Sequence, residues 1–156
     1  MLLFDITLLF VNPVKQFMKL RKMMKKDLKP LAKIDAREYK HTTEKQSLKV
    51  FSHLFKNKVP GACLIAEEDG EVIGYLFAEK KTTFIKDTAG IQTIWVTKKR
   101  RGRGVGTALI RECLSAMRKH GIKSVSLTAR EGNKRALSLY KKFRFEPFRV
   151  IYYRRL

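Results

Sequence analysis

A dense cluster of basic residues and glycines lies at residues 97–107, TKKRRGRGVGT. It contains three alternating glycines and five cations without an acid: Gly102, Gly104, Gly106, Lys98, Lys99, Arg100, Arg101 and Arg103. An apolar run at 91–96 precedes it and an amphipathic pattern begins at Thr107, which is the order strand, loop, helix. At a helix start the first N–H groups lack intrahelical acceptors, and glycine lets an anion approach them closely. The segment therefore predicts a site for a phosphate-bearing cofactor.

Length and composition predict one domain with a sizeable core. The chain has 156 residues, of which 44% are hydrophobic, and this suits a single globular unit. Its two cysteines, Cys63 and Cys113, cannot form a disulfide scaffold, and neither has a CxxC partner. We interpret both as small core residues in a reducing compartment, which predicts a cytoplasmic location.

The net charge of +21 is unevenly distributed. Residues 88–156 hold eighteen Lys and Arg against three acids, so 18 − 3 = +15 of the charge lies there. A field of that sign favours a nucleotide cofactor, a nucleic acid or an acidic protein surface. A lysine-rich surface that only maintains solubility is the alternative.

Residues 1–17 differ from the rest of the chain. Their apolar stretch is too short to span a bilayer, Asp5 interrupts it, and it lacks a basic start and a small-residue cleavage site. We therefore expect neither a membrane anchor nor a signal peptide. The segment is either an extra strand or helix on an exposed edge, or an upstream translation start before a domain at 18–156.

The first half of that domain reads as a strand, two helices and a meander. We expect a strand at 20–23, a helix with Asp27 as its N-cap, and a second helix from near Ser47. Pro60 and Gly61 end the helical pair. Three antiparallel strands then follow, at 62–67, 72–78 and 91–96, with turns at Asp69-Gly70 and 87–90.

The second half reads as helix, strand, helix, strand. The helix that starts at Thr107 ends near Gly121, and residues 123–130 alternate as a strand. A strand that follows such a crossover lies parallel to the strand before it. A helix at 133–143 and a closing strand at 148–153 complete the expected fold, an α+β domain with a mixed sheet.

Spacing distinguishes the glycine loop from two other phosphate-binding loops. A Walker loop needs GxxxxGK[ST], and a dinucleotide fingerprint needs GxGxxG, whereas this chain has GxGxG. The run Arg101-x-x-Gly104-x-Gly106 instead resembles the [RQ]-x-x-G-x-[GA] signature of the GNAT superfamily of acyl-CoA N-acyltransferases. Residues 96–106 are similar to that family's V-x-P-x-x-R-G-x-G-x-G run, with Lys98 in the proline position. Residues 133–140 resemble its N-x-x-A-x-x-L-Y helix, so the resemblance covers all but residues 1–17.

The resemblance implies the acyl-CoA N-acyltransferase fold, with a central, mostly antiparallel mixed sheet, flanking helices and a splayed parallel strand pair. It implies acetyl-CoA as cosubstrate and no metal. Backbone groups of Ile94, Trp95 and Val96 would pair with the pantetheine arm, and Asn133 would bond that arm or cap the last helix. Arg101 would shape the loop, and N–H groups of a continuous run would hold the pyrophosphate: Gly102, Arg103, Gly104, Val105, Gly106 and Thr107.

The implied reaction is direct transfer of an acetyl group to a primary amine, on a protein N-terminus, a lysine or a small molecule. The amine must lose a proton, the oxyanion needs donors, and the departing thiolate needs a proton. Tyr140 matches the family's general acid; a core aromatic is its structural alternative. Thr128 stands where related ribosomal-protein acetyltransferases have a glutamate, so the base is open.

Three candidates remain for that base: Glu38, Glu79, or a water held by backbone carbonyls. His41 and His53 lie in the region that shapes the acceptor site in the family, but a lone histidine is more often a surface or core residue. A second departure is Arg144, where the family has glycine. The competing function is a basic module that binds nucleic acid or an acidic partner without catalysis. The acceptor amine and the oligomeric state are left open.

Overall fold

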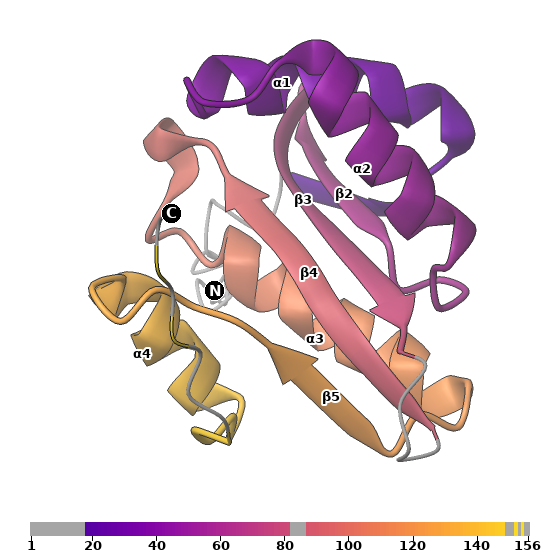
Figure 1. The fold of residues 1–156 in the computed structure, drawn as a ribbon, viewed down its shortest axis with the longest axis vertical. Helices are drawn as coiled ribbons and strands as arrows, with labels where there is room; N and C mark the ends of the chain where they lie inside the picture. Colours follow the sequence, from indigo (N-terminus) through magenta and orange to yellow (C-terminus); the bar gives the residue numbers. More distant parts are fainter. Residues whose placement is uncertain (1–17, 82–86, 149–151, 153, 155–156) are drawn as a thin grey trace, which may run out of the picture.

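A five-stranded sheet in the order β1-β2-β3-β4-β5 organises the molecule (Figure 1). The structure is a computed structural model that describes residues 18–81, 87–148, 152 and 154. Its strands are β1 (Met18–Lys22), β2 (Leu64–Glu68), β3 (Glu71–Lys80), β4 (Thr88–Val96) and β5 (Ser124–Leu127). Its α-helices are α1 (Leu28–Glu38), α2 (Glu44–Lys56), α3 (Val105–Lys119) and α4 (Lys134–Lys142), and short 3-10 turns are η1 (Lys25–Asp27) and η2 (Lys98–Arg100).

The sheet is mixed, as predicted. Strands β1 to β4 pair antiparallel, and β5 pairs parallel to β4 after the α3 crossover. In Figure 1, α1 and α2 lie together at the top while α3 passes behind β4. Together these elements make the expected α+β fold. Within the described residues, no helix combines the length and the apolar character needed to cross a membrane.

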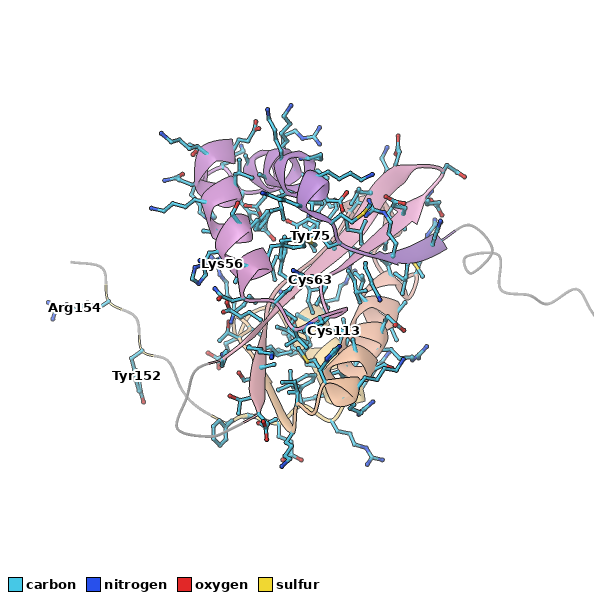
Figure 2. The ribbon with its side chains drawn as sticks, turned by 90° about the vertical axis from the view of Figure 1, so that its right-hand side faces the viewer. Lys56, Cys63, Tyr75, Cys113, Tyr152 and Arg154 are labelled. Atoms are coloured by element: carbon cyan, nitrogen blue, oxygen red, sulfur yellow. The ribbon has the colours of Figure 1, made fainter. Side chains whose placement is uncertain are left out.

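Two hydrophobic cores lie on the two faces of the sheet, and β3 contributes to both. Tyr75 and Phe77 pack with residues of α1 and α2, whereas Leu76 and Ala78 pack with residues of α3. Successive side chains of a strand point to opposite faces, so a strand covered on both sides reads as a continuous apolar run. Figure 2 shows Tyr75 beneath the helical pair.

Both cysteines are buried and free, which confirms their interpretation as core residues. Cys63 precedes β2 and Cys113 lies on α3, as Figure 2 shows. Burial raises the pKa of the Cys63 thiol to about 11 and that of the Cys113 thiol to about 12. Both thiols are therefore protonated and unreactive at neutral pH.

Several predicted boundaries were wrong, each for a local physical reason. Helix α2 begins at Glu44 rather than near Ser47, because Thr43 caps it by accepting a hydrogen bond from the Gln46 N–H at 3.2 Å. Helix α3 begins at Val105 rather than Thr107 because Gly104, with φ 83°, serves as its N-cap residue.

Asp27 is the N-cap residue of α1, as expected, but its side chain makes no capping hydrogen bond to that helix. Its carboxylate accepts the Met24 N–H at 2.7 Å and pairs with Arg21 at 2.8 Å. These contacts tie the end of β1 to the start of the helical pair. The expected N-cap position is therefore confirmed, and the side chain does not bond the helix because it is turned back toward the strand.

The predicted turn at 87–90 is mostly strand, since β4 already begins at Thr88. The strand expected at 123–130 is shorter, ending at Leu127. Residues 1–17 and most of the closing strand expected at 148–153 lie outside the described residues, and Phe148 itself is not in a strand.

Helices α3 and α4 end in the same motif with different residues at the left-handed position. After α4, the Phe145 N–H donates to the Tyr140 carbonyl and the Arg144 N–H to the Lys141 carbonyl, with Arg144 at φ 60°. This pattern is a Schellman motif, which favours glycine at that position. After α3, Gly121 occupies the equivalent position at φ 72°.

We therefore expect Arg144→Gly to stabilise the protein by about 1 kcal/mol, because glycine adopts this conformation without the Cβ penalty. The reciprocal change, Gly121→Arg, should destabilise it by a similar amount. Urea denaturation of the two variants and the native protein measures both effects. A loss of stability in Arg144→Gly would show that contacts of the Arg144 side chain outweigh its backbone strain.

Candidate active site

The parallel strands β4 and β5 separate partway along their length. They pair from Thr88 opposite Ser124 to Ile91 opposite Leu127, where β5 ends, while β4 continues beside β3 as far as Val96. Gln92 is an extra residue at this point, because the β3 partner of Ile91 is Ala78 and that of Thr93 is Phe77. Such a bulge bends a strand and increases its twist. The last five residues of β4 therefore have β3 on one edge and no β5 partner on the other.

The open edge of β4 presents the backbone groups of Ile94 and Val96. The Thr97 N–H donates to the Ile73 carbonyl at 2.9 Å, so Thr97 points its backbone toward β3. Successive residues of a strand direct their N–H and C=O groups to alternate edges. Those of Trp95 therefore face β3, and those of Ile94 and Val96 face away from it. The Val96 carbonyl on this edge accepts a hydrogen bond from Arg101 Nε at 2.9 Å. A main-chain edge is thus available next to the glycine loop.

The glycine loop joins this edge to the start of α3. Gly102 and Gly104 have φ values of 78° and 83°, which only glycine adopts readily. Val105 is fully buried and fixes the first turn of the helix in the core. The loop therefore presents exposed backbone at a helix N-terminus, the arrangement that binds phosphate groups.

The cations of this loop divide into two groups. Arg100 pairs with Glu68, and Arg101 bonds the Val96 carbonyl, so these two side chains hold the loop in shape. Lys98, Lys99 and Arg103 are exposed. Their charge adds to the positive end of the α3 dipole and favours an anion at the loop.

Gly106 has a packing role. A Cβ at this position would lie 3.1 Å from Leu139 Cδ2 on α4. Such a contact is closer than side-chain carbons normally approach. Gly106 therefore lets the first turn of α3 lie against α4, which brings α4 beside the open end of β4.

Helix α4 carries two of the predicted site residues. Asn133 caps it, since its Oδ1 accepts the Ala136 N–H at 3.2 Å; this is one of the two roles expected for that side chain. Tyr140 lies seven residues later on the same side of the helix, half-buried, with its ring 6.1 Å from that of Phe145. Burial raises the pKa of the Tyr140 phenol, which keeps it protonated at neutral pH.

A cleft of about 660 Å³ lies where these elements meet. Its walls come from the end of α1 and the start of α2, the open part of β4, the segment after β5, and α4. The lining residues are Asp35, Tyr39, His41, Thr42, Gln46, Ile91, Gln92, Thr93, Ile94, Thr128, Arg130, Asn133 and Tyr140. The fold thus brings Ile94, Asn133 and Tyr140 together in one cleft, although they are distant in sequence.

The other predicted binding residues lie outside this lining. Val96, Arg101 and residues 102–107 continue from the cleft along the end of β4 to the start of α3. The Trp95 side chain packs in the core beneath α1 and α2, stacked on Tyr75 with ring centroids 5.4 Å apart. Its Nε1 is buried without a hydrogen-bond partner among the described residues.

The structure separates the two glutamates expected as candidate bases from Thr128, which replaces the family's glutamate, and from His41. Thr128 and His41 line the cleft, whereas Glu38 and Glu79 are not among its lining residues. His53 lies near the end of α2, where its ring is 3.3 Å from the Asn57 side-chain amide. Neither predicted glutamate thus faces the cleft.

One acid that does line the cleft was missed by sequence reasoning. Asp35 accepts hydrogen bonds from Ser47 Oγ at 2.6 Å and from the Tyr75 hydroxyl at 3.3 Å. A signal for it was present, because Asp35 follows Leu28 and Leu31 at the spacing of the buried face of α1. An acid on such a face needs partners, which sequence alone does not identify.

Comparison with known proteins gives a consistent result. Residues 28–145 match the family model described as Acetyltransferase (GNAT) family. An N-alpha-acetyltransferase of Sulfurisphaera tokodaii is 32% identical over 99 residues, which cover 58% of this chain and 59% of that protein. A putative ribosomal protein bS18-alanine N-acetyltransferase of Bacillus subtilis is 28% identical over 127 residues, covering 81% and 80%. The chain spans only 28% to 59% of the length of four curated relatives, that of Sulfurisphaera tokodaii included.

Solved structures share the fold. The aminoglycoside N-acetyltransferase AAC(6')-Iy in complex with CoA superposes with a TM-score of 0.74 at 21% identity, covering 88% of this chain and 94% of that one. A GNAT family acetyltransferase from Brucella melitensis, in complex with acetyl-CoA, gives a TM-score of 0.64 at 25% identity, covering 83% of each chain. The splayed strand pair and the flanking helices therefore form the acyl-CoA N-acyltransferase fold predicted from the sequence.

Proposed function

Because the chain belongs to the acetyltransferase (GNAT) family, we propose that it transfers an acetyl group from acetyl-CoA to a primary amine. One observation carries this proposal. The separation of β4 and β5 after Ile91 leaves a main-chain edge that runs from the cleft with Tyr140 to the glycine loop. An extended ligand arm with a phosphate at one end and a reactive group at the other fits such a path.

The residues along this path suit the parts of acetyl-CoA. Ile94 and Val96 would pair with the pantetheine amides, as a peptide pairs with an open sheet edge. Trp95 lies between them with its backbone turned to β3, so its part is to hold the strand through its buried ring. N–H groups of 102–107 would bind the pyrophosphate, with Lys98, Lys99 and Arg103 adding charge. Arg101 would maintain the loop through its bond to the Val96 carbonyl.

The same residues account for the chemistry. An outward N–H near Val96 would polarise the thioester carbonyl and stabilise the oxyanion that forms on attack. The amine loses a proton to water before it attacks the acetyl carbon. Tyr140 gives its phenolic proton to the departing thiolate and then recovers one from the amide nitrogen that has formed. Asn133 fixes the start of α4 and so the position of Tyr140.

The names of the relatives indicate the class of acceptor only in broad terms. The relatives' names include N-alpha-acetyltransferases and a diaminobutyric acid acetyltransferase, so protein N-termini and small amines are both candidates. Lysine side chains are the third. We propose a reducing, cytoplasmic setting, supported by the two free, buried cysteines.

A direct assay tests the proposal. The protein is incubated with acetyl-CoA and, in turn, with peptides that have a free N-terminus, with peptides whose only amine is a lysine, and with small primary amines. We expect CoA release above the rate of hydrolysis for at least one class. Acetyl-CoA binding without acetylation of any class would favour a binding module without catalysis.

A further inference from the structure

Asp35 is the sole carboxylate among the described residues that line the cleft. It lies on α1, whereas other parts of the lining come from α4 and the segment after β5. Two other lining residues bear basic groups, the guanidinium of Arg130 and the imidazole of His41. In a protein with a net charge of +21, a carboxylate at this point is the group of the lining that attracts a cation.

Neutral donors hold the Asp35 carboxylate in place. Ser47 Oγ donates to Oδ2 at 2.6 Å, and the Tyr75 hydroxyl donates to Oδ1 at 3.3 Å. Ser47 is 3% exposed and Tyr75 is fully buried, so both donors are fixed by the core. Each oxygen of a carboxylate can accept two hydrogen bonds, and each has received one. The remaining acceptor capacity is available to a ligand.

Asp35 belongs to none of the ion pairs among the described residues. Three acids close to β1 and β2 differ in this respect. Asp27 and Glu67 pair with Arg21, and Glu68 pairs with Arg100. A carboxylate that is only partly exposed and has no cationic partner is suited to receive a cation from outside.

We propose that Asp35 binds the ammonium group of the acceptor and holds it beside the thioester. This inference rests on the proposed function and deepens it, because it names the charged form that the cleft recognises. The acceptor is a primary amine that enters as an ammonium ion. A second cation close to that ammonium is rejected by Arg130, so amines with one positive charge at the reacting end are preferred over polyamines.

The hydrogen bonds of Asp35 suit it to recognition of a ligand. Ser47 and Tyr75 both donate to its carboxylate and fix its orientation. Asp35 therefore acts as a positioning residue for the amine, and the proton leaves to water as in the proposed reaction.

Asp35→Asn separates this role from a purely structural one. Asparagine has nearly the same shape, and its oxygen can still accept from Ser47 or Tyr75, but it carries no charge. Loss of one charge-assisted hydrogen bond of about 1.5–3 kcal/mol corresponds to roughly a 10- to 100-fold loss of amine affinity. Glu112→Gln, an exposed carboxylate on α3, is the matched control for removal of one negative charge.

The experiment measures kcat and KM for the best acceptor of the panel described above, together with the rise in melting temperature caused by acetyl-CoA. For Asp35→Asn we expect a 10- to 100-fold higher KM for the amine, a kcat within a few-fold of the native value, and an unchanged response to acetyl-CoA. Glu112→Gln should behave as the native protein.

Other outcomes overturn the inference in distinct ways. An unchanged KM means that Asp35 only ties α1 to α2, and a fall in kcat alone means that it acts on the proton instead. Acetyl-CoA binding without acetylation of any amine would contradict the proposed function itself, and so would the absence of any stabilisation by acetyl-CoA.

Discussion

Gly104→Glu removes the stabilisation that acetyl-CoA gives the native protein. A ligand at 100 times its Kd stabilises the folded state by about 2.7 kcal/mol, which raises the melting temperature of a domain of this size by roughly 5–10 °C. The new carboxylate would stand at the N-cap of α3, where the pyrophosphate is expected, and would repel it. Thermal denaturation with and without acetyl-CoA measures the difference.

Gly70→Glu is the matched control for this variant. Gly70 has φ 79°, close to the 83° of Gly104, and an added Cβ meets nothing within 4 Å at either position. Both variants therefore bear a similar backbone penalty of about 1–2 kcal/mol, but Gly70 lies in the β2–β3 turn, away from the glycine loop. We expect Gly70→Glu to keep the full response to acetyl-CoA. A full response in Gly104→Glu as well would place the cofactor elsewhere.

Tyr140→Phe lowers kcat by about 100-fold, within the range that a general acid contributes. The substitution keeps the ring and its edge contact with Phe145 and removes only the hydroxyl. Single-turnover measurement of acetyl transfer, under conditions where chemistry limits the rate, isolates this effect. The rise in melting temperature with acetyl-CoA should persist, because the main-chain binding groups are unchanged.

The pH profile of the native protein provides a second check on Tyr140. Burial raises the pKa of its phenol above the ordinary value of about 10. The acid form is present below the raised pKa, so the tyrosine-dependent part of the rate is lost only as pH rises beyond about 10.

Tyr152→Phe, at a position that is 92% exposed, serves as the control for Tyr140→Phe and should match the native rate. An unchanged rate in Tyr140→Phe would leave that residue a core aromatic.

Patterns among residues close in sequence were sufficient to predict the glycine loop and the elements on either side of it. The apolar run of β3, the Asp69-Gly70 turn and the amphipathic pattern of α3 each depend on residues close in sequence, and each appears in the structure. The order of these elements also predicted a mixed sheet, because the strand after the helical crossover lies parallel to the strand before it. The family resemblance then supplied the splay of the parallel strands, which spacing alone does not show.

Features that depend on distant partners were missed. Residues Thr88 to Gly90 read as a turn because they are small or polar. They form strand because β5 pairs with all three and β3 pairs with Ala89 and Gly90. The extra residue at Gln92 is visible only when β3 is placed beside β4. Asp35 shows the same limit, since its partners Ser47 and Tyr75 lie 12 and 40 residues away.

Transfer of a labelled acetyl group is the most direct test of the central claim. The protein is mixed with acetyl-CoA that carries an isotopically labelled acetyl group and with the best amine of the acceptor panel. Mass spectrometry then follows the amine while thiol titration follows free CoA. We predict one labelled acetyl on the amine nitrogen for each CoA released. Release of CoA without labelled amide, or no release in the presence of any amine, would contradict the account.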